Sequence, residues 1–145
     1  MNRVLVTGAS GLIGRQVVRQ LSAGNHTVFA LSGAGNPPDD AHSPGVKWLQ
    51  ADILDRPAMT RIMKDTKAQG LIHLAWTTGA EFRDSFVDHL NCADASISLI
   101  NAFAQKAGER LVFAGFFAEY DGHDRYACSS DLTLPDAPLS PRSVL

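Results

Sequence analysis

The chain has 145 residues, a formal net charge of −2 and a pI near 6.2, with 45% hydrophobic and 19% charged residues. These values are typical of one soluble globular domain, and they argue against nucleic acid or an acidic membrane surface as the main partner. Two cysteines make no disulfide framework, no Cys/His cluster has zinc spacing, and neither a signal peptide nor a membrane-spanning apolar run is found, so we expect a cytoplasmic protein without a metal site.

The first predicted strand, Val4–Thr7, leads directly into a glycine run. Gly8, Gly11 and Gly14 follow one another at intervals of three residues. Gly8 would permit a turn at a backbone conformation that is closed to residues with a Cβ. Gly11 would let the main chain approach a pyrophosphate closely, and Gly14 would let the following helix lie tight against the strand.

An amphipathic helix is predicted to begin inside this glycine run. Its apolar face is formed by Ile13, Val17 and Leu21, and Gly24 is predicted to follow its end as the C′ residue. The free N–H groups and the positive end of the helix dipole would hold an anion. The alternative is an ordinary glycine-rich turn, but the preceding strand and the following helix favour a dinucleotide-binding motif. We therefore expect the cofactor to contact Gly8, Ser10, Gly11, Leu12, Ile13 and Gly14.

The spacing Thr-Gly-x-x-Gly-x-x-Gly, at residues 7–14, differs from the G-x-G-x-x-G of common dehydrogenases. It resembles the short-chain dehydrogenase/reductase family. The run Ala-Ser-Gly-Leu-Ile-Gly at residues 9–14 resembles the extended branch, the NAD-dependent epimerase/dehydratases, which act largely on nucleotide sugars. The resemblance covers Arg3 to about Asp121. It implies NAD or NADP as the cofactor, and a nucleotide sugar or another small carbonyl compound as the substrate of full-length relatives.

The second predicted strand is Val28–Leu31, and Ser32 and Gly33 follow it. In a dinucleotide fold, the residue just past this strand meets the adenosine ribose, and an acid there selects NAD. We place Ser32 at this position. Because neither Ser32 nor Gly33 is an acid or an arginine, the sequence leaves both NAD and NADP open.

The third predicted strand, Val46–Leu49, precedes Asp52 and Ile53. The resemblance implies that these two residues touch the adenine, with the acid accepting a hydrogen bond from its amino group. The alternative is that Asp52 is a plain turn residue. Asp55 is predicted to be the N-cap of a helix that runs to about Lys67.

The fourth predicted strand, Leu71–Ala75, contains the sequence His-Leu-Ala, which resembles the family motif at the cofactor edge of the sheet. The resemblance implies that the backbone of Leu74 and Ala75 passes the ribose and the pyrophosphate. His73 is interpreted as a packed structural histidine rather than a general base. Trp76 either lines the site or covers a helix, and the sequence does not decide between the two.

A long helix is predicted from about Asp84 to Ala107, followed by a fifth strand, Leu111–Gly115. Asn91 matches an asparagine that, by the resemblance, helps to order the active site, so we include it in the cofactor site. Strands that alternate with helices predict an α/β fold, a Rossmann-type doubly wound parallel sheet of about five strands in the order 3-2-1-4-5. The helix face predicted to meet the core carries Phe86, Leu90, Ala93, Ile97, Ile100 and Ala104.

Beyond the fifth strand the sequence departs from the catalytic pattern of the family. Aligned on Tyr120, the serine or threonine of the family falls at Phe116, which cannot make the same hydrogen bond. The Tyr-x-x-x-Lys dyad is absent, because the last lysine is Lys106. No catalytic residue is therefore assigned, and Tyr120 is the only candidate for a rescuing acid.

We expect residues 1–121 to be an NAD(P)-binding Rossmann domain and residues 122–145 to be a proline-rich irregular tail, truncated before the substrate lobe of the family. The predicted function is NAD(P) binding in an epimerase/dehydratase (oxidoreductase) lineage, without catalysis by this chain. The alternatives are a non-catalytic dinucleotide-binding sensor or scaffold module, and a fragment without a function of its own. A fifth strand at the sheet edge also predicts a homo-oligomer.

Overall fold

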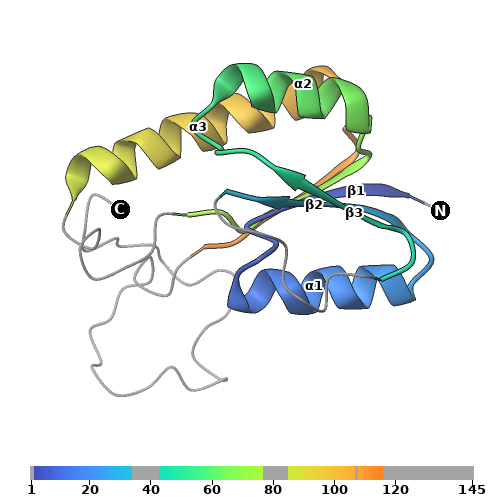
Figure 1. The fold of residues 1–145 in the computed structure, drawn as a ribbon. Coiled ribbons are helices and arrows are strands. Elements are labelled where there is room, and N and C mark those ends of the chain that lie inside the picture. Colours follow the sequence, from blue (N-terminus) through green and yellow to red (C-terminus); the bar gives the residue numbers. More distant parts are fainter. Residues whose placement is uncertain (1, 34–42, 77–84, 107, 116–145) are drawn as a thin grey trace, which may run out of the picture. The chain divides into compact units, whose positions relative to one another are not determined.

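The computed structural model describes residues 2–33, 43–76, 85–106 and 108–115 (Figure 1). The chain divides into two compact units, Met1–Phe113 and Ala114–Leu145. The parallel sheet and its helices belong to the first unit. The domain boundary predicted between residues 121 and 122 lies outside the described residues, as do Phe116 and Tyr120.

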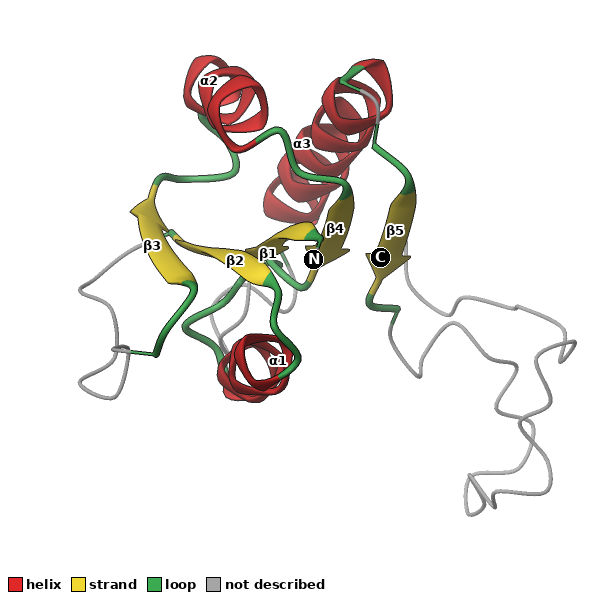
Figure 2. Ribbon diagram, turned by 90° about the vertical axis from the view of Figure 1, so that its right-hand side faces the viewer, coloured by secondary structure: helices red, strands yellow, loops and turns green. Residues whose placement is uncertain are grey.

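Five parallel strands lie in the order β3-β2-β1-β4-β5, which confirms the predicted order. Figure 2 shows α1 on one face of the sheet, and α2 and α3 on the other. This is the doubly wound, Rossmann-type arrangement. In chain order the elements are β1 (Arg3–Thr7), α1 (Leu12–Ala23), β2 (Thr27–Ser32), β3 (Val46–Gln50), α2 (Arg56–Thr66), β4 (Gly70–His73), α3 (Phe86–Gln105) and β5 (Arg110–Phe113).

The central strand β1 supplies side chains to both layers of the core. Leu5 points to one face, where it packs in a cluster with residues of α2 and α3 that include Met63 and Leu99. Val4 and Val6 point to the other face and pack in a second cluster with Val18 of α1. This alternation follows from the pleat of a strand, which turns successive side chains to opposite faces.

The helix α2 begins and ends at the residues that the sequence indicates. The side chain of Asp55 accepts a hydrogen bond from the amide of Ala58 at 3.0 Å, which confirms Asp55 as the N-cap. Pro57 lies in the first turn, where its missing N–H costs no helical hydrogen bond. Lys67 has a φ of 45° and ends the helix in the left-handed conformation.

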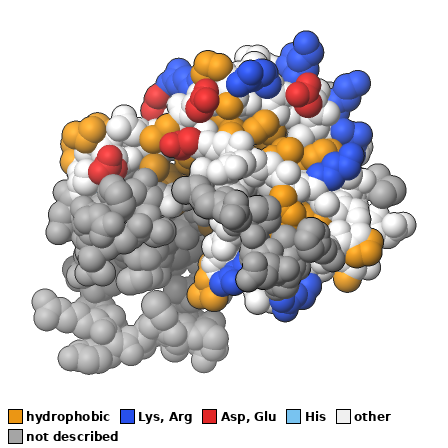
Figure 3. Space-filling model, in the orientation of Figure 1, with side chains coloured by type: hydrophobic (Ala, Val, Ile, Leu, Met, Phe, Trp, Pro, Cys, Tyr) orange, Lys and Arg blue, Asp and Glu red, His pale blue; other side chains and the backbone are white. Residues whose placement is uncertain are grey.

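The predicted core face of the long helix is wrong. Phe86 and Ile97 are 52% and 60% exposed, although both belong to the predicted apolar stripe, and Figure 3 shows hydrophobic side chains at the surface over this helix. The buried side chains of α3 are instead Cys92, Ala95, Ser96, Leu99 and Phe103. This second set also repeats at three and four residues, so α3 has two apolar faces and periodicity alone could not choose between them.

Two details of α1 also differ from the prediction. Val18 and Gly14 are its buried residues, whereas Ile13 is exposed at the first turn. Gly24 has an ordinary φ of −86°, and the left-handed residue is the next one, Asn25, with a φ of 58°. Asparagine tolerates this conformation better than most residues with a Cβ, so the turn moves by one residue.

Candidate dinucleotide site

The turn between β1 and α1 is built on Gly8. This residue has a φ of +66°, and an added Cβ would lie 2.8 Å from the amide nitrogen of Ala75. The turn is closed by a hydrogen bond from the amide of Gly11 to the carbonyl of Gly8, at 3.0 Å. The amide of Ala9 donates to the carbonyl of Leu31 on β2, also at 3.0 Å. Only glycine combines this φ with this close approach to the chain after β4.

Gly14 holds α1 against the same turn. An added Cβ at this position would lie 2.1 Å from the carbonyl oxygen of Gly8 and 2.7 Å from the Cα of Ala9. Real Cβ contacts are never this short, so any side chain would push the first turn of α1 away from the sheet. The roles predicted for Gly8 in the turn and for Gly14 in helix packing are therefore what the backbone requires.

Gly11 differs from both, because the folded chain makes little demand on it. Its φ is −71°, and among the described residues an added Cβ would meet one atom, the carbonyl oxygen of Gly8, in a tight contact of 3.2 Å. Gly11 is exposed and is the N-cap of α1, but it offers no side chain to the free amides of the first turn. The first amide that bonds within the helix is that of Arg15, to the carbonyl of Gly11 at 3.1 Å. The amides before it lie in the first turn of α1, where an α-helix leaves them without a helical partner, and such amides suit a phosphate.

Of the other predicted contacts in the turn, Leu12 and Ile13 are exposed and Ser10 is half-buried. Ser10 Oγ accepts a hydrogen bond from Ser32 Oγ at 3.1 Å. Ser32 is the last residue of β2 and is buried, so it does not lie past the strand as predicted. The first residue beyond the strand is Gly33, which is exposed, and no atom of the described residues lies within 4 Å of an added Cβ there.

The residues after β3 have structural roles of their own. Asp52 is exposed, and its Oδ1 accepts from the amide of Leu54 at 2.9 Å, as in the turn alternative for this residue. Ile53 is half-buried and packs against the core cluster under α2 and α3. The turn hydrogen bond of Asp52 uses Oδ1 and leaves Oδ2 for another donor. Contact of Asp52 and Ile53 with an adenine stays a prediction.

The chain leaves the sheet earlier than predicted at β4, which ends at His73. The amides of Leu74 and Ala75 then both donate to the side-chain oxygen of Thr7, each at 3.2 Å. Trp76 lies against α3, where its Nε1 donates to His89 Nδ1 at 3.3 Å and the two rings stack 6.1 Å apart. Trp76 therefore covers the helix.

His73 is buried, as predicted, and both of its ring nitrogens have partners. Nδ1 lies 2.7 Å from Thr7 Oγ1, and Nε2 lies 2.8 Å from Ser96 Oγ on α3. Its ring also packs on Phe113 of β5, with the ring centroids 5.3 Å apart. Burial lowers the pKa of His73 to about 4, because desolvation disfavours the charged imidazolium.

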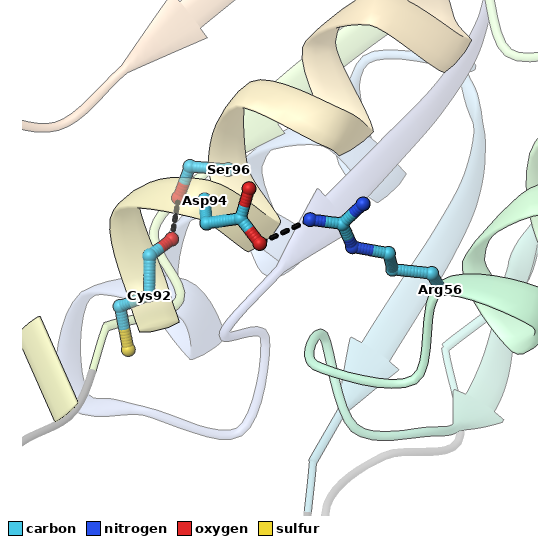
Figure 4. A network of polar contacts seen from close by, with 4 residues as sticks. All are labelled: Arg56, Cys92, Asp94 and Ser96. Carbon is cyan, nitrogen blue, oxygen red and sulfur yellow. Dashed lines mark hydrogen bonds and ion pairs between the residues drawn. The ribbon is translucent and has the colours of Figure 1, made fainter. Parts of the chain in front are cut away.

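Thr7 and Ser96 were not predicted from the sequence as the hydrogen-bond partners of His73. Ser96 is buried on α3, and its hydroxyl donates to the carbonyl of Cys92 at 2.7 Å (Figure 4). A polar residue inside an apolar helical repeat is a signal that could have identified Ser96. The prediction from the sequence placed the other apolar repeat of α3, which is the exposed one, against the core. The same figure shows Arg56 of α2 paired with Asp94 of α3, an exposed ion pair that joins the two helices.

Asn91 is exposed on α3, and no hydrogen bond from its side chain to another described residue supports the ordering role expected for it. In the described part of the chain, no group of three His, Cys, Asp or Glu side chains could hold a metal ion. In the same residues, no helix has the length and apolar character needed to cross a membrane.

The model of the NAD dependent epimerase/dehydratase family matches residues 4–144. The chain belongs to this family. A dTDP-6-deoxy-L-talose 4-dehydrogenase (NAD(+)) from Aggregatibacter actinomycetemcomitans is 30% identical over 116 residues, and a UDP-glucose 4-epimerase from Arabidopsis thaliana is 28% identical over 141 residues. The chain spans 42% and 40% of the lengths of these two relatives, and 80% and 88% of its own length is matched.

Solved structures of the epimerase/dehydratase type share the fold. The UDP-Glc/GlcNAc 4-epimerase of Campylobacter jejuni superposes with a TM-score of 0.82 at 20% identity, over 97% of this chain and 44% of that one. The UDP-glucose 4-epimerase of Thermus thermophilus in complex with NAD gives 0.78 at 24% identity, over 97% and 45%. The cofactor expected from the glycine run, NAD or NADP, agrees with the NAD-dependent family to which the chain belongs.

Proposed function

We propose that this chain binds NAD(H) or NADP(H) at the carboxyl edge of its sheet, with the pyrophosphate on the turn from Gly8 to Gly14. The observation that carries the proposal is the contrast among the three glycines. Gly8 and Gly14 are demanded by the fold itself, whereas Gly11 is exposed, has an ordinary φ, and meets a single tight contact of an added Cβ, at 3.2 Å, among the described residues. An exposed glycine at the N-cap leaves room for a ligand beside the first turn of α1, whose amides suit an anion.

The remaining contacts follow from the same placement. Ser10, Leu12 and Ile13 belong to the turn, and the backbone of Leu74 and Ala75 packs directly against Gly8. Farther residues of the proposed site are Ser32 at the end of β2, Asp52 and Ile53 at the adenine, and Asn91 on α3, whereas Trp76 covers α3 and is left out. When bound, the nicotinamide ring would exchange a hydride with a substrate. The residues of this chain bind and orient the dinucleotide.

For the whole protein, we propose a nucleotide sugar as the substrate. The support is the family and the relatives, among them a dTDP-sugar dehydrogenase and UDP-glucose epimerases. The 145 residues themselves are proposed not to transfer hydride, because Phe116 replaces the expected serine or threonine and no Tyr-x-x-x-Lys occurs among them. The second candidate, a non-catalytic sensor or scaffold module, is favoured by the same replacement.

Calorimetric titration of the chain with NAD⁺, and separately with NADP⁺, tests the binding proposal. Gly11→Val should weaken binding at least about tenfold, because its side chain would occupy the approach to the pyrophosphate. Ala104→Val is the matched control, since it adds a similar volume at an exposed position near the end of α3. Equal affinity in all three proteins, or no binding by the wild type, would refute the proposal.

Turnover tests the proposed inactivity of the 145 residues. Cofactor oxidation or reduction is followed with a panel of UDP- and dTDP-sugars and small keto compounds. The 145-residue chain should show none, and Phe116→Ser should not restore any, because groups that act as a unit do not contribute separately. Wild-type turnover that disappears in Tyr120→Phe would assign Tyr120 as the acid and refute the inactive state.

A further inference from the structure

A chain of hydrogen bonds runs from the end of β1 to α3 through His73. Thr7 Oγ1 lies 2.7 Å from His73 Nδ1, His73 Nε2 lies 2.8 Å from Ser96 Oγ, and Ser96 Oγ donates to the carbonyl of Cys92 at 2.7 Å. The side chains of Thr7, His73 and Ser96 are all buried. No solvent therefore competes for these bonds, and each proton must be placed by the partners themselves.

The direction of every bond in this chain follows from its end on α3. At this end, the Cys92 carbonyl can only accept, so Ser96 uses its single proton there and must accept from His73 Nε2–H. A neutral ring then carries its proton on Nε2, so Nδ1 is an acceptor and Thr7 must donate to it. Thr7 Oγ1 in turn accepts from the amides of Leu74 and Ala75, and the amide of Leu74 also donates to the carbonyl of Thr7 at 3.3 Å.

We propose that His73 is a positioning residue for the sheet edge at which the dinucleotide is proposed to bind. Its Nδ1 accepts a hydrogen bond from the Thr7 hydroxyl, and this turns the lone pairs of Thr7 Oγ1 to the amides of Leu74 and Ala75. This rests on the proposed function, because the edge is a site only if the cofactor binds there. The two amides belong to the backbone against which Gly8 packs, since an added Cβ at Gly8 would lie 2.8 Å from the nitrogen of Ala75. The placement of that backbone thus depends on a side chain anchored to α3.

Two features of the surroundings support a histidine that stays neutral. An imidazolium has no lone pair for Thr7, so protonation would break the bond between Thr7 and His73. Burial lowers the pKa of His73 to about 4, which keeps the ring neutral at physiological pH. The ring is covered by Phe113 at a centroid distance of 5.3 Å, so the strand β5 closes the remaining side.

The tautomer is measured directly on the wild-type chain, without any cofactor. Long-range ¹H–¹⁵N correlation spectra distinguish the Nε2–H tautomer, the Nδ1–H tautomer and the imidazolium. At neutral pH, His73 should show the Nε2–H pattern, with a protected Thr7 hydroxyl proton. The Nδ1–H tautomer or a charged ring would overturn the proposal, whatever the affinity for NAD⁺.

Two substitutions separate positioning from mere packing. His73→Asn brings an acceptor oxygen near the place of Nδ1 but cannot reach Ser96, whereas His73→Gln brings a donor near the place of Nε2 but leaves Thr7 without its acceptor. Amide hydrogen exchange at Leu74 and Ala75 should accelerate at least about tenfold in His73→Gln and much less in His73→Asn. Equal acceleration in both variants would overturn the proposal.

Titration with NAD⁺ follows the same pair of variants. The Kd should rise about tenfold in His73→Gln and stay within about threefold of the wild type in His73→Asn. A wild-type chain that shows the Nε2–H tautomer and the exchange difference, but binds no NAD⁺ or NADP⁺, would refute the proposed function alone. Should neither variant fold, Thr7→Ser, which keeps the hydroxyl, and Thr7→Val, which removes it, test the same bond from its other side. Equal exchange at Leu74 and Ala75 in these two would overturn the positioning role.

Discussion

The carbonyl oxygen of Gly8 occupies the place where a side chain on Gly14 would begin, because an ideal Cβ on Gly14 would lie only 2.1 Å from that oxygen. Gly8 itself stands at a φ of +66°, close to the backbone of Ala75. The first turn of α1 is thus packed backbone to backbone against the end of β1. This contact between Gly14 and the turn therefore fixes the amides of the first turn of α1 at the end of β1, without any ligand.

This packing predicts that substitutions at two glycines of the turn change the free energy of unfolding by different amounts. Gly14→Ala should destabilise the chain by about 1–3 kcal/mol, because the backbone must move to admit the methyl group. Gly11→Ala should change the free energy of unfolding by less than about 1 kcal/mol, since the position is exposed and has an ordinary φ. Urea unfolding followed by circular dichroism measures both. Similar losses in the two variants would contradict this account.

Discrimination between NAD and NADP should be weak in the wild type. Gly33 is the first residue past β2 and brings neither an acid nor an arginine to the ribose, while Ser32 is engaged with Ser10. A preference below about tenfold, or 1.4 kcal/mol, is expected in side-by-side titrations. A larger one would mean that another residue makes the selection.

A substitution at Gly33 should make the chain selective for NAD over NADP. Gly33→Asp should favour NAD over NADP by at least about tenfold, because its carboxylate would repel the 2′-phosphate. Within the described part of the chain no atom lies within 4 Å of an added Cβ, so the substitution should leave the sheet and its helices intact. Gly33→Asn, of the same size but uncharged, is the control. If both variants shift the preference alike, charge is not the cause.

The neutral His73 makes stability depend on pH. Its pKa is lowered from 6.5 to about 4 in the folded chain, so the unfolded chain binds the proton more readily between these values. Stability from this group is therefore complete above pH 6.5 and is lost as the pH falls toward 4, by an amount of the order of 3 kcal/mol. Unfolding free energies near pH 7 and pH 4.5 should differ more in the wild type than in His73→Gln. Identical differences would rule out His73 as the titrating group.

The isolated chain should self-associate. In the described residues, β5 pairs with β4 alone, and Leu111, Val112 and Phe113 are all exposed on it. Exposed strand edges and apolar patches recruit other chains. Val112→Lys should shift the sedimentation profile toward the monomer, whereas Arg110→Lys, on the same strand, should not. A wild type that sediments as a stable monomer at micromolar concentration would disprove this prediction.

The sheet was predictable because each of its strands is a short apolar run bounded by turn residues, and parallel topology follows from the alternation with helices. The exposed face of α3 was not, because both of its faces are apolar and the choice depends on a partner far away in the sequence. The inner face packs Leu99 and Phe103 into the core cluster and places the hydroxyl of Ser96 beside His73. Likewise, Gly8, Gly11 and Gly14 look alike in the sequence, and only their neighbours in space distinguish the two that the fold requires from the one that it does not.

The strand order also carries a consequence for how the chain is made. β1 leaves the ribosome first and lies in the middle of the sheet, and β2 and β3 then add in turn at one side of it. β4 and β5 add at the other side, again in the order of synthesis. No strand has to insert between two that are already paired, so the sheet can grow outward as translation proceeds. The glycine turn follows β1 directly and is therefore synthesised early. The backbone of Leu74 and Ala75, which contacts Gly8, is synthesised only after β4.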